Sequence, residues 1–431
     1  MNITDLASTA RPVRIIQFGG GVFLRGFFDW MLAKANAAGV MDASAVIVRA
    51  RTGGEDPLSA QRFRYTHAAR DGSHNDITLV DCIAGSLNPA DDWEAYLSLA
   101  DNPDASVIVS NTTESGIVYT PCPTPAHGVP ESFPARLTAL LHRRFLHKLP
   151  GFLILPCELI DTNGDTLREL VLRHAADWSL GEDFARFVTN ECSFRNTLVD
   201  RIVSGKPGEG DSIDLPYEDT LVNTSEYFHL WVIDGEEDER LPFAKIGLNV
   251  RWVPDINPYR TLKVRILNGA HTSMIPYALL RGVETVGECM SDSILRGHLE
   301  ACLFEEIIPS LDSDPAEAEA YAKDVLERFS NPYIHHLCRS IALNSLDKFR
   351  VRVLPSILAY QAKTGRRPSH LLFSLAMLIR LYKDGTPNDT DEKIAYMRST
   401  SVRDILANAA LWGSDLSEYA EEVEHDTHTS L

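Results

Sequence analysis

The segment from residue 13 to residue 32, VRIIQFGGGVFLRGFFDWML, constrains the fold most strongly because it changes from strand to helix across three glycines. Its first residues are apolar and typical of a strand, the glycines at 19 to 21 break the strand, and large apolar residues then recur at helical spacing. A strand, a glycine turn and a helix N-terminus form an anion site, because backbone N–H groups and the positive helix end face the ligand. The segment predicts the first strand, turn and helix of a dinucleotide-binding domain.

The glycine spacing departs in one place from the G-x-G-x-x-G fingerprint of such turns. Gly19 and Gly21 match it, the third position is Leu24, and Gly26 follows two residues later. The alternative is a plain turn, but the position directly after the first apolar strand favours cofactor binding. We expect Gly26 to allow close packing of helix on strand, and we place these residues of the turn at the cofactor: Phe18, Gly19, Gly20, Gly21, Phe23 and Arg25.

Short apolar runs alternate with helical stretches through the first half of the chain, which is typical of a parallel sheet covered by helices on both faces. Polar or glycine-rich sequence follows each run. Ligands of open α/β sheets bind beyond the carboxyl ends of the strands, so we expect these loops to line one crevice. The sequence predicts an α/β protein with an N-terminal Rossmann-like, doubly wound domain, whose strands include residues 13–18, 45–49, 106–110 and 151–155.

The second half of the chain has a helical pattern. The segment from about residue 204 to 239 is rich in Gly, Asp and Glu, and we expect the domain boundary there. This gives a dinucleotide-binding domain over residues 1–238 and a mostly α-helical substrate and catalytic domain over residues 239–431. Helices are expected at 261–280, 291–308, 315–329, 333–347, 350–364 and 369–382, before an acidic, frayed C-terminus.

Composition limits the partners and the compartment. The net charge is −19 and no run rich in lysine or arginine occurs, which disfavours nucleic acid and anionic membranes as partners. The seven cysteines are dispersed without a C-x-x-C pair, so we expect neither disulfides nor a zinc site. No apolar run approaches the ~20 residues of a membrane span, and the N-terminus lacks a signal-peptide core. The sequence predicts a cytoplasmic protein that acts on a small molecule.

Residues 263 to 271, KVRILNGAH, carry an amine, a carboxamide and an imidazole on one expected helix, with no metal-binding cluster nearby. At ~100° per residue, Asn268 lies roughly 140° and His271 roughly 80° around the helix from Lys263, so all three can face one cleft. The alternative is a helix that carries polar residues on its solvent side. Gly269 costs roughly 1 kcal/mol in a helix interior, which indicates that a substrate or a neighbouring helix approaches the backbone there.

Five motifs in this order resemble those of the polyol-specific long-chain dehydrogenases, the mannitol dehydrogenase family: QFGGGVFLRGFFDW, SNTTESG, LPCELIDTNGD, NTLVDRIV and K-x4-N-x2-H. The resemblance extends from Arg14 to beyond Pro355. It implies an N-terminal nucleotide-binding domain, a helical C-terminal domain and hydride transfer without a metal. It also implies that Asn111, Thr113 and Glu114 lie at the cofactor and Asp200 at the substrate.

The resemblance gives Lys263 the role of the catalytic lysine, Asn268 that of the carbonyl-polarising asparagine, and His271 that of the substrate-orienting histidine. These roles agree with the chemistry of ketone reduction. A hydride arrives at carbon while a proton must reach the developing alkoxide, so a proton donor has to contact that oxygen. We therefore expect these three residues to be catalytic.

Two positions depart from the family pattern. The family's second carbonyl-binding asparagine is replaced in CELID by Glu158 and Leu159, so Asn268 acts with Lys263 alone or Asn111 or Asn163 reaches in. The second strand ends in Arg49 and Arg51, where an acidic residue would bind the adenosine ribose. An arginine there suits the 2′-phosphate of NADP, whereas the resemblance to uronate reductases implies NAD. We expect NAD, with NADP as the alternative.

The segment DKFRVR offers Lys348, Arg350 and Arg352, in a region that supplies basic substrate contacts in the family. A guanidinium fork or paired cations would fix a carboxylate, which predicts a sugar acid as substrate. All three lie on one side if the segment is extended, whereas Lys348 and Arg352 pair on a helix. The alternative is a basic stripe that neutralises the acidic surface.

The resemblance implies, as the reaction, the NAD(H)-dependent interconversion of tagaturonate and altronate in hexuronate catabolism. The alternatives are reduction of fructuronate to mannonate, oxidation of mannitol, and, from another class, a protein that senses NAD(H) without turnover. Other side chains receive no role from the sequence. We interpret His335 and His336 as packing or surface residues, and Cys157 as a small buried residue.

Overall fold

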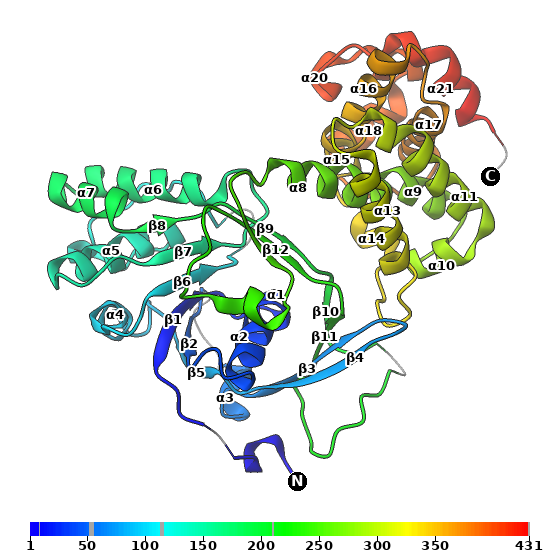
Figure 1. Ribbon diagram of the computed structural model, residues 1–431. Coiled ribbons are helices and arrows are strands. Elements are labelled where there is room, and N and C mark those ends of the chain that lie inside the picture. Colours follow the sequence, from blue (N-terminus) through cyan, green and yellow to red (C-terminus); the bar gives the residue numbers. More distant parts are fainter. Residues whose placement is uncertain (8, 51–55, 113–115, 209–210, 430–431) are drawn as a thin grey trace. The chain divides into compact units, whose positions relative to one another are not determined.

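The computed structural model describes residues 1–431 except 8, 51–55, 113–115, 209–210 and 430–431, and it divides into two compact units (Figure 1). Unit 1 is Met1–Ile256 and unit 2 is Asn257–Leu431. The division lies one strand beyond the boundary expected at 238/239. The reason is that β13 (Val250–Val253) pairs in parallel with β12 (Leu230–Asp234) and so belongs to unit 1.

A parallel six-stranded sheet forms the centre of unit 1, in the order β5-β2-β1-β6-β7-β8. The expected doubly wound fold is therefore confirmed. Its first strand lies between the second and the sixth, so the chain reverses direction across the sheet at this point, where open α/β sheets bind ligands. The strands are β1 (Val13–Phe18), β2 (Ser44–Val48), β5 (Ile83–Leu87), β6 (Val107–Ser110), β7 (Leu153–Pro156) and β8 (Ser193–Phe194).

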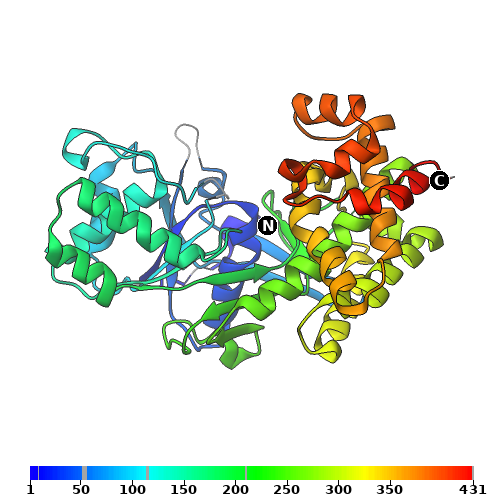
Figure 2. The ribbon, with the colours of Figure 1, turned by 90° about the horizontal axis from the view of Figure 1, so that it is seen from above.

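Alternate residues of β1 enter two different cores, one on each face of the sheet. Ile15 packs with α2 and the residues around it, whereas Ile16 packs with α5 and α6. Figures 1 and 2 show α6 and α7 beside α5. The helices of unit 1 are α1 (Val22–Gly26), α2 (Phe28–Ala37), α3 (Pro57–Ala60), α4 (Trp93–Ser98), α5 (Phe133–Leu146), α6 (Asn163–Asp177) and α7 (Glu182–Asn190).

Two smaller sheets complete unit 1. One has the order β10-β11-β3-β4 and the other the order β13-β12-β9. The first of these contacts α1, the helix that follows the glycine turn. The additional elements are β3 (Tyr65–Arg70), β4 (Asn75–Val80), β9 (Thr197–Asp200), β10 (Val203–Gly205), β11 (Asn223–Glu226) and the short 3-10 turns Ile3–Asp5, Leu99–Asp101, Pro125–His127 and Pro242–Ile246.

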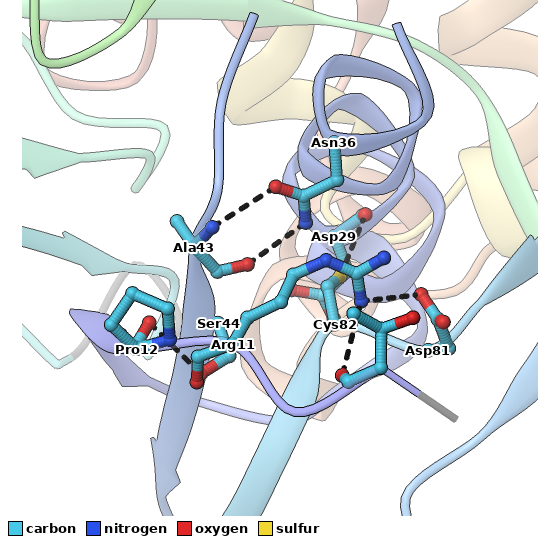
Figure 3. Close-up of polar contacts among 9 residues, drawn as sticks. Arg11, Pro12, Asp29, Asn36, Ala43, Ser44, Asp81 and Cys82 are labelled. Atoms are coloured by element: carbon cyan, nitrogen blue, oxygen red, sulfur yellow. Dashed lines mark hydrogen bonds and ion pairs between the residues drawn. The ribbon is translucent and has the colours of Figure 1, made fainter. Parts of the chain in front are cut away.

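In the central sheet, polar contacts connect the residues at the amino-terminal ends of β1, β2 and β5 (Figure 3). The side chain of Asn36 donates to the Ala43 carbonyl and accepts from its N–H, at 2.8 and 3.0 Å. Arg11 pairs with Asp81 at 3.1 Å, and the Ser44 hydroxyl donates to the Arg11 carbonyl at 3.0 Å. These bonds fix the connection from α2 to β2, and with it the helix that follows the glycine turn.

Unit 2 is helical, as expected, and its core surrounds α9 and α17. The buried helix α17 packs against both α9 and α21. The elements are α8 (Asn257–Leu262), η5 (Lys263–Asn268), α9 (Gly269–Leu280), α10 (Val286–Ser291), α11 (Ser293–Ala301), η6 (Cys302–Ile307), α12 (Ile308–Ser310), α13 (Pro315–Phe329), α14 (Cys338–Ile341), α15 (Ser345–Arg352), α16 (Leu354–Thr364), α17 (Ser369–Asp384), α18 (Asp391–Ser399), α19 (Val402–Ala407), α20 (Ala409–Trp412), the turn Ser417–Tyr419 and α21 (Ala420–Thr427).

The helices of unit 2 differ in detail from these expectations. The helices expected at 261–280 and 291–308 each contain a π-helical turn, η5 and η6. The helix expected at 333–347 is divided into α14 and α15, because Asn344 has left-handed backbone angles (φ 54°) that a helix cannot continue through. The acidic segment was expected to be frayed, but its residues up to Thr427 belong to α21, which buries Val423 in the core of unit 2.

Among the described residues, no helix combines the length and the apolar character that crossing a membrane requires.

Candidate functional site

The glycine turn after β1 has two glycines that the fold requires and one that borders open space. Gly19 has φ 109°, and a Cβ there would lie 2.7 Å from the Asn111 carbonyl oxygen. A Cβ on Gly20 would lie 3.1 Å from a methyl group of Ile47. A Cβ on Gly21, which precedes α1, would meet no atom within 4 Å. The turn therefore leaves room beside the first N–H groups of α1, where a pyrophosphate would fit.

Gly26 provides close packing, but against a different sheet from the one expected. A Cβ on Gly26 would lie within 2.9 Å of side-chain atoms of Val203, Asn223 and His67, which belong to β10, β11 and β3. Leu24, at the third fingerprint position, is buried in the core. The glycine expected at the third fingerprint position is thus found two residues later, where α1 packs on the second sheet.

A buried polar network lies beneath the turn. The Gln17 amide donates to the Gly19 carbonyl at 3.0 Å and to the Asp29 carboxylate at 3.4 Å. The Tyr65 hydroxyl contacts the Arg25 carbonyl at 2.8 Å and Asp29 at 3.2 Å. Burial raises the pKa of Asp29 to about 7, while hydrogen bonds from Gln17 and Tyr65 and the charge of Arg25 oppose that rise. The network ties the turn to α2, which also accepts a bond from Cys82 at the Asp29 carbonyl (Figure 3).

The expected cofactor residues divide into those at the turn and those in the core. The ring of Phe18 packs on Phe133 at 4.7 Å between centroids, so only the backbone of Phe18 lies at the turn. Phe23 stacks on Phe27 at 5.1 Å. The guanidinium of Arg25 lies 5.6 Å from the ring centroid of Tyr65.

The loop after β2 begins with Arg49, whose guanidinium lies 3.8 Å from the carboxylate of Asp91. Thr113 and Glu114, which the sequence places at the cofactor, and Arg51 lie outside the described residues. The contribution of these residues therefore stays a prediction.

Glu158, which replaces the family's second asparagine, joins the loops after β6 and β7. Its side chain is 2% exposed and accepts hydrogen bonds from the Ser110 hydroxyl at 3.0 Å and from the N–H and hydroxyl of Thr112 at 2.8 and 2.9 Å. Burial raises the pKa of Glu158, and these hydrogen bonds oppose that rise. Leu159, by contrast, is 58% exposed. Glu158 is thus a structural bridge between the two loops.

Asn111 and Asn163, considered as substitutes for the family's second asparagine, make hydrogen bonds within unit 1. The Asn163 amide donates to the carbonyls of Pro156 and Glu158, at 2.9 and 3.1 Å, and its oxygen accepts from the Thr197 N–H at 2.9 Å. Asn111 donates to the Cys157 carbonyl at 2.9 Å. The hypothesis that Asn163 reaches the substrate is therefore wrong, because its amide group is buried and its hydrogen bonds are made within the protein at the start of α6.

Asp200 and Cys157 are buried residues of unit 1. Asp200 is the last residue of β9 and lies opposite Leu230 of β12. Burial raises the pKa of the Cys157 thiol well above its usual value, which disfavours a nucleophilic thiolate. The role of Asp200 at the substrate stays a prediction.

In unit 2, Lys263 and Asn268 are the first and last residues of the π-helical turn η5. A π turn contains more residues than an α turn because its hydrogen bonds run from i to i+5. The rotation between Lys263 and Asn268 therefore differs from the 140° of an α-helix, and the two come closer to one face. His271 lies three residues further on, in α9, and returns to that side of the helix.

Gly269 allows a neighbouring helix to approach. A Cβ there would lie 3.4 Å from the Arg352 carbonyl oxygen and 3.7 Å from Ile307. Of the two expected neighbours, substrate or helix, the structure thus shows the end of α15.

His271 is a buried histidine among aromatic and basic groups. Its side chain is 6% exposed, and its ring stacks on Phe329 at 4.1 Å and meets the His336 ring edge-on at 5.2 Å. Burial lowers the pKa of His271 well below its usual value, and the charges of His336, Arg352, Arg328 and Lys348 lower it further. The imidazole is therefore neutral, and its Nε2 atom has no hydrogen-bond partner within the described chain.

The segment DKFRVR is helical, as α15. Lys348 and Arg352 are four residues apart and share a face, whereas Arg350 points elsewhere and lies 3.8 Å from Asp347. The Lys348 ammonium donates to the Ile341 carbonyl at 2.9 Å. The structure thus selects the helical alternative and separates Arg350 from the other two.

Sequence reasoning missed two residues near His271. His336, interpreted from the sequence as a packing or surface residue, packs with its ring edge-on to that of His271. Arg328 lies at the end of α13, beside Phe329, and is buried. Periodicity could not indicate either residue, because they approach α9 from a separate helix and from the loop before α14.

Within the described ranges, no group of three or more His, Cys, Asp or Glu side chains is arranged to hold a metal ion.

Family models match both units. The model of the mannitol dehydrogenase Rossmann domain matches residues 13–244, and that of the mannitol dehydrogenase C-terminal domain matches residues 255–430. Altronate oxidoreductase from Yersinia enterocolitica serotype O:8 / biotype 1B is 38% identical over 97% of this chain and 93% of the relative. Altronate oxidoreductase from Klebsiella pneumoniae (strain 342) is 40% identical over 99% of this chain and 95% of the relative.

Solved structures share the fold. A D-sorbitol dehydrogenase in substrate-free form has a TM-score of 0.82 at 22% identity, over 95% of this chain and 92% of that one. The ternary complex of Pseudomonas fluorescens mannitol 2-dehydrogenase with NAD and D-mannitol has a TM-score of 0.75 at 20% identity, over 99% and 92%. Because both family models match and the relatives cover nearly the whole chain, the protein belongs to the mannitol dehydrogenase family.

Proposed function

We propose that this protein is an NAD(H)-dependent oxidoreductase that interconverts tagaturonate and altronate. One observation carries the choice of a sugar acid: α15 has Lys348 and Arg352 on one face, and its end approaches Gly269, between Asn268 and His271. A carboxylate is fixed best by such cations, whereas a neutral polyol does not need them. The altronate oxidoreductases at 38% and 40% identity support the same substrate class.

The proposed reduction assigns one task to each residue of the helix. Lys263 donates a proton to the alkoxide oxygen as it forms, and Asn268 donates a hydrogen bond to the ketone oxygen and polarises it. His271 is neutral, so one ring nitrogen can donate to a substrate hydroxyl while the other accepts. In oxidation the same groups act in reverse, and Lys263 takes up the proton. No step in this scheme requires a metal ion.

The glycine turn would hold the pyrophosphate of the cofactor, since Gly21 borders open space at the start of α1. The bound nicotinamide supplies or accepts the hydride. The surroundings of Arg49 support NAD over NADP, because the carboxylate of Asp91 lies 3.8 Å away and would repel a 2′-phosphate. NADP remains the alternative cofactor, since Arg49 itself is a suitable partner for that phosphate.

Three other functions are alternatives. Reduction of fructuronate would use the same groups and differ only in the stereochemistry of the sugar. Mannitol oxidation would not use the cations around His271, because a hexitol carries no carboxylate. A protein that only senses NAD(H) would need the glycine turn but not the lysine, asparagine and histidine.

A substrate panel distinguishes these functions. Tagaturonate, fructuronate and fructose would each be mixed with NADH or NADPH, and loss of absorbance at the nicotinamide band would be followed. We expect the highest kcat/KM with tagaturonate and NADH. Faster turnover of fructuronate or fructose would establish the corresponding alternative, and cofactor binding without turnover of any ketone would establish the sensing protein.

A further inference from the structure

The ring pair formed by the buried His271 and the partly buried His336 contains two polar atoms without a hydrogen-bond partner among the described residues. Nε2 of His271 and Nδ1 of His336 are both buried, and neither has a hydrogen-bond partner within the described ranges. Buried polar groups in native proteins are almost always paired, because an unpaired one costs free energy. Two such atoms on rings 5.2 Å apart indicate that a ligand completes their hydrogen bonding.

The surroundings of the two rings indicate the charge of that ligand. Arg328 at the end of α13, and Lys348 and Arg352 on one face of α15, are among the groups whose charge acts on His271. Lys348 also acts on His336. Arg328 also acts on the Asp324 carboxylate, whose pKa burial raises and Arg328 lowers against that rise. A group of cations at one place favours an anionic ligand. A carboxylate oxygen can accept a hydrogen bond from His336 while a hydroxyl of the same ligand contacts His271.

We infer that His336 is a specificity-determining residue that donates a hydrogen bond to the carboxylate of the substrate beside Arg328, Lys348 and Arg352, while His271 contacts a hydroxyl of the same molecule. This inference rests on the proposed function for the identity of the substrate, a sugar acid. It extends that function by placing the carboxylate at the face of α9 that carries His271. It also gives a role to a histidine outside the K-x4-N-x2-H motif.

The neutral state of both rings fits this role. Burial lowers the pKa of His271 and of His336, so that each ring keeps one N–H donor without adding a further positive charge. The stacking of His271 on Phe329 fixes the plane of that ring. His336 is fixed from behind, because the Val286 N–H donates to its carbonyl at 3.0 Å.

Two substitutions of His336 separate a hydrogen-bonding role from a packing role. His336→Phe keeps an aromatic ring against His271 but loses the N–H donor, whereas His336→Gln keeps a donor and loses the ring. His335→Phe is the matched control, because the adjacent His335 is exposed. The dissociation constant of D-altronate would be measured by calorimetry for the wild type and each variant, with the affinity for NADH measured separately.

We expect His336→Phe to weaken altronate binding about tenfold to a hundredfold, the usual effect of losing a hydrogen bond to a charged group. His336→Gln should recover part of that loss, His335→Phe should bind as the wild type does, and the affinity for NADH should stay the same in all variants. Retained binding in His336→Phe together with weakened binding in His336→Gln would show packing and overturn the inference. Equal binding in all three variants would overturn it as well.

The wild-type protein offers a test that needs no folded variant. In a titration followed by NMR, D-altronate should shift the ring signals of His271 and His336, and a neutral hexitol should not. An unshifted His336 signal at saturation contradicts the inference. If altronate shifts both signals but tagaturonate is not reduced with NADH, the proposed function fails while the carboxylate site stands.

Discussion

Lys263 is the residue on which the proposed chemistry depends, because it begins the π turn that brings it toward the side of Asn268 and His271. Replacing Lys263 by alanine removes the proton donor, and we expect kcat to fall by roughly 10²–10⁴-fold, the usual contribution of general acid–base catalysis. NADH should bind as before, since the glycine turn is in unit 1. Stopped-flow turnover and NADH fluorescence would check both expectations. Activity close to that of the wild type would remove Lys263 from the mechanism.

A second prediction at this scale concerns Asp29, whose pKa burial raises to about 7 from 3.8. The folded state therefore binds a proton at Asp29 that the unfolded state releases. The stabilisation linked to this proton is complete below pH 3.8 and is lost as the pH rises through 7. Between these two pH values the free energy of unfolding falls by at most about 1.4 kcal/mol per pH unit.

Asp29→Asn isolates this effect, because the amide cannot titrate. Urea unfolding at several pH values should show that the wild type loses stability relative to the variant as the pH rises from 5 to 8. The variant should keep the bond from Gln17, which the Asn side-chain oxygen can also accept. A difference between the two proteins that is constant over this range would show that Asp29 is ionised throughout.

Single residues also mark what the sequence could indicate about the site. Lys263, Asn268 and His271 were predicted as a group because all three lie in nine consecutive residues. Asn163 could not be excluded from the sequence, since its four-way bonding to Pro156, Glu158, Gly164 and Thr197 appears only in the fold. His336 was missed for the same reason: its neighbour in space, His271, is far from it in sequence.

At the scale of elements, the segment between β1 and α2 contains two glycines with different tasks. Gly21 leaves space open beside the start of α1, and Gly26 allows α1 to pack closely on the second sheet. An alanine at position 21 would place its Cβ in open space at the start of α1, whereas an alanine at position 26 would meet three side chains within 2.9 Å. We expect Gly26→Ala to lower the free energy of unfolding by roughly 1–3 kcal/mol, which is typical of overpacking.

Gly21→Ala is the matched variant, and we expect it to weaken NADH binding rather than lower stability. Its stability should change by about 1 kcal/mol or less, while NADH binds more weakly because the added methyl group occupies the space for the pyrophosphate. Thermal unfolding and NADH titration of both variants would check this division. Weaker NADH binding in Gly26→Ala alone would place the cofactor elsewhere.

Elements differed in how well the sequence indicated them. The parallel strands β1, β2, β6 and β7 were predicted because strands buried on both faces are short continuous apolar runs. The strand β11 was not, because its four residues NTSE are polar and yet all buried, paired with β3 and β10. The π turn η5 was also missed, since the spacing of apolar residues does not distinguish a π turn inside a longer helix.

At the scale of the whole molecule, the chain carries a net charge of −19 although its proposed substrate is an anion. Long-range attraction cannot explain binding of such a substrate, since the net charge repels it. Arg328 is buried and Lys348 and Arg352 are partly buried, so salt screens their charges less than it screens the exposed charges of the surface. Local charge, not net charge, therefore decides whether a sugar acid can bind.

The division into two units leads to a last prediction, in which two N-terminal fragments are compared. Unit 1 has its own cores, so we expect the fragment 1–256 to fold alone and to bind NADH without reducing tagaturonate. The fragment 1–238, which ends at the boundary expected from the sequence, lacks β13 and the buried side chains of Leu241, Phe243 and Leu248. Each such side chain contributes roughly 2 kcal/mol by burial, so the shorter fragment should be unfolded or much less stable. Circular dichroism melting curves of both fragments, with and without NADH, would decide. Equal stability would place the end of the nucleotide-binding unit at residue 238, because the segment up to 256 would then add nothing to its core.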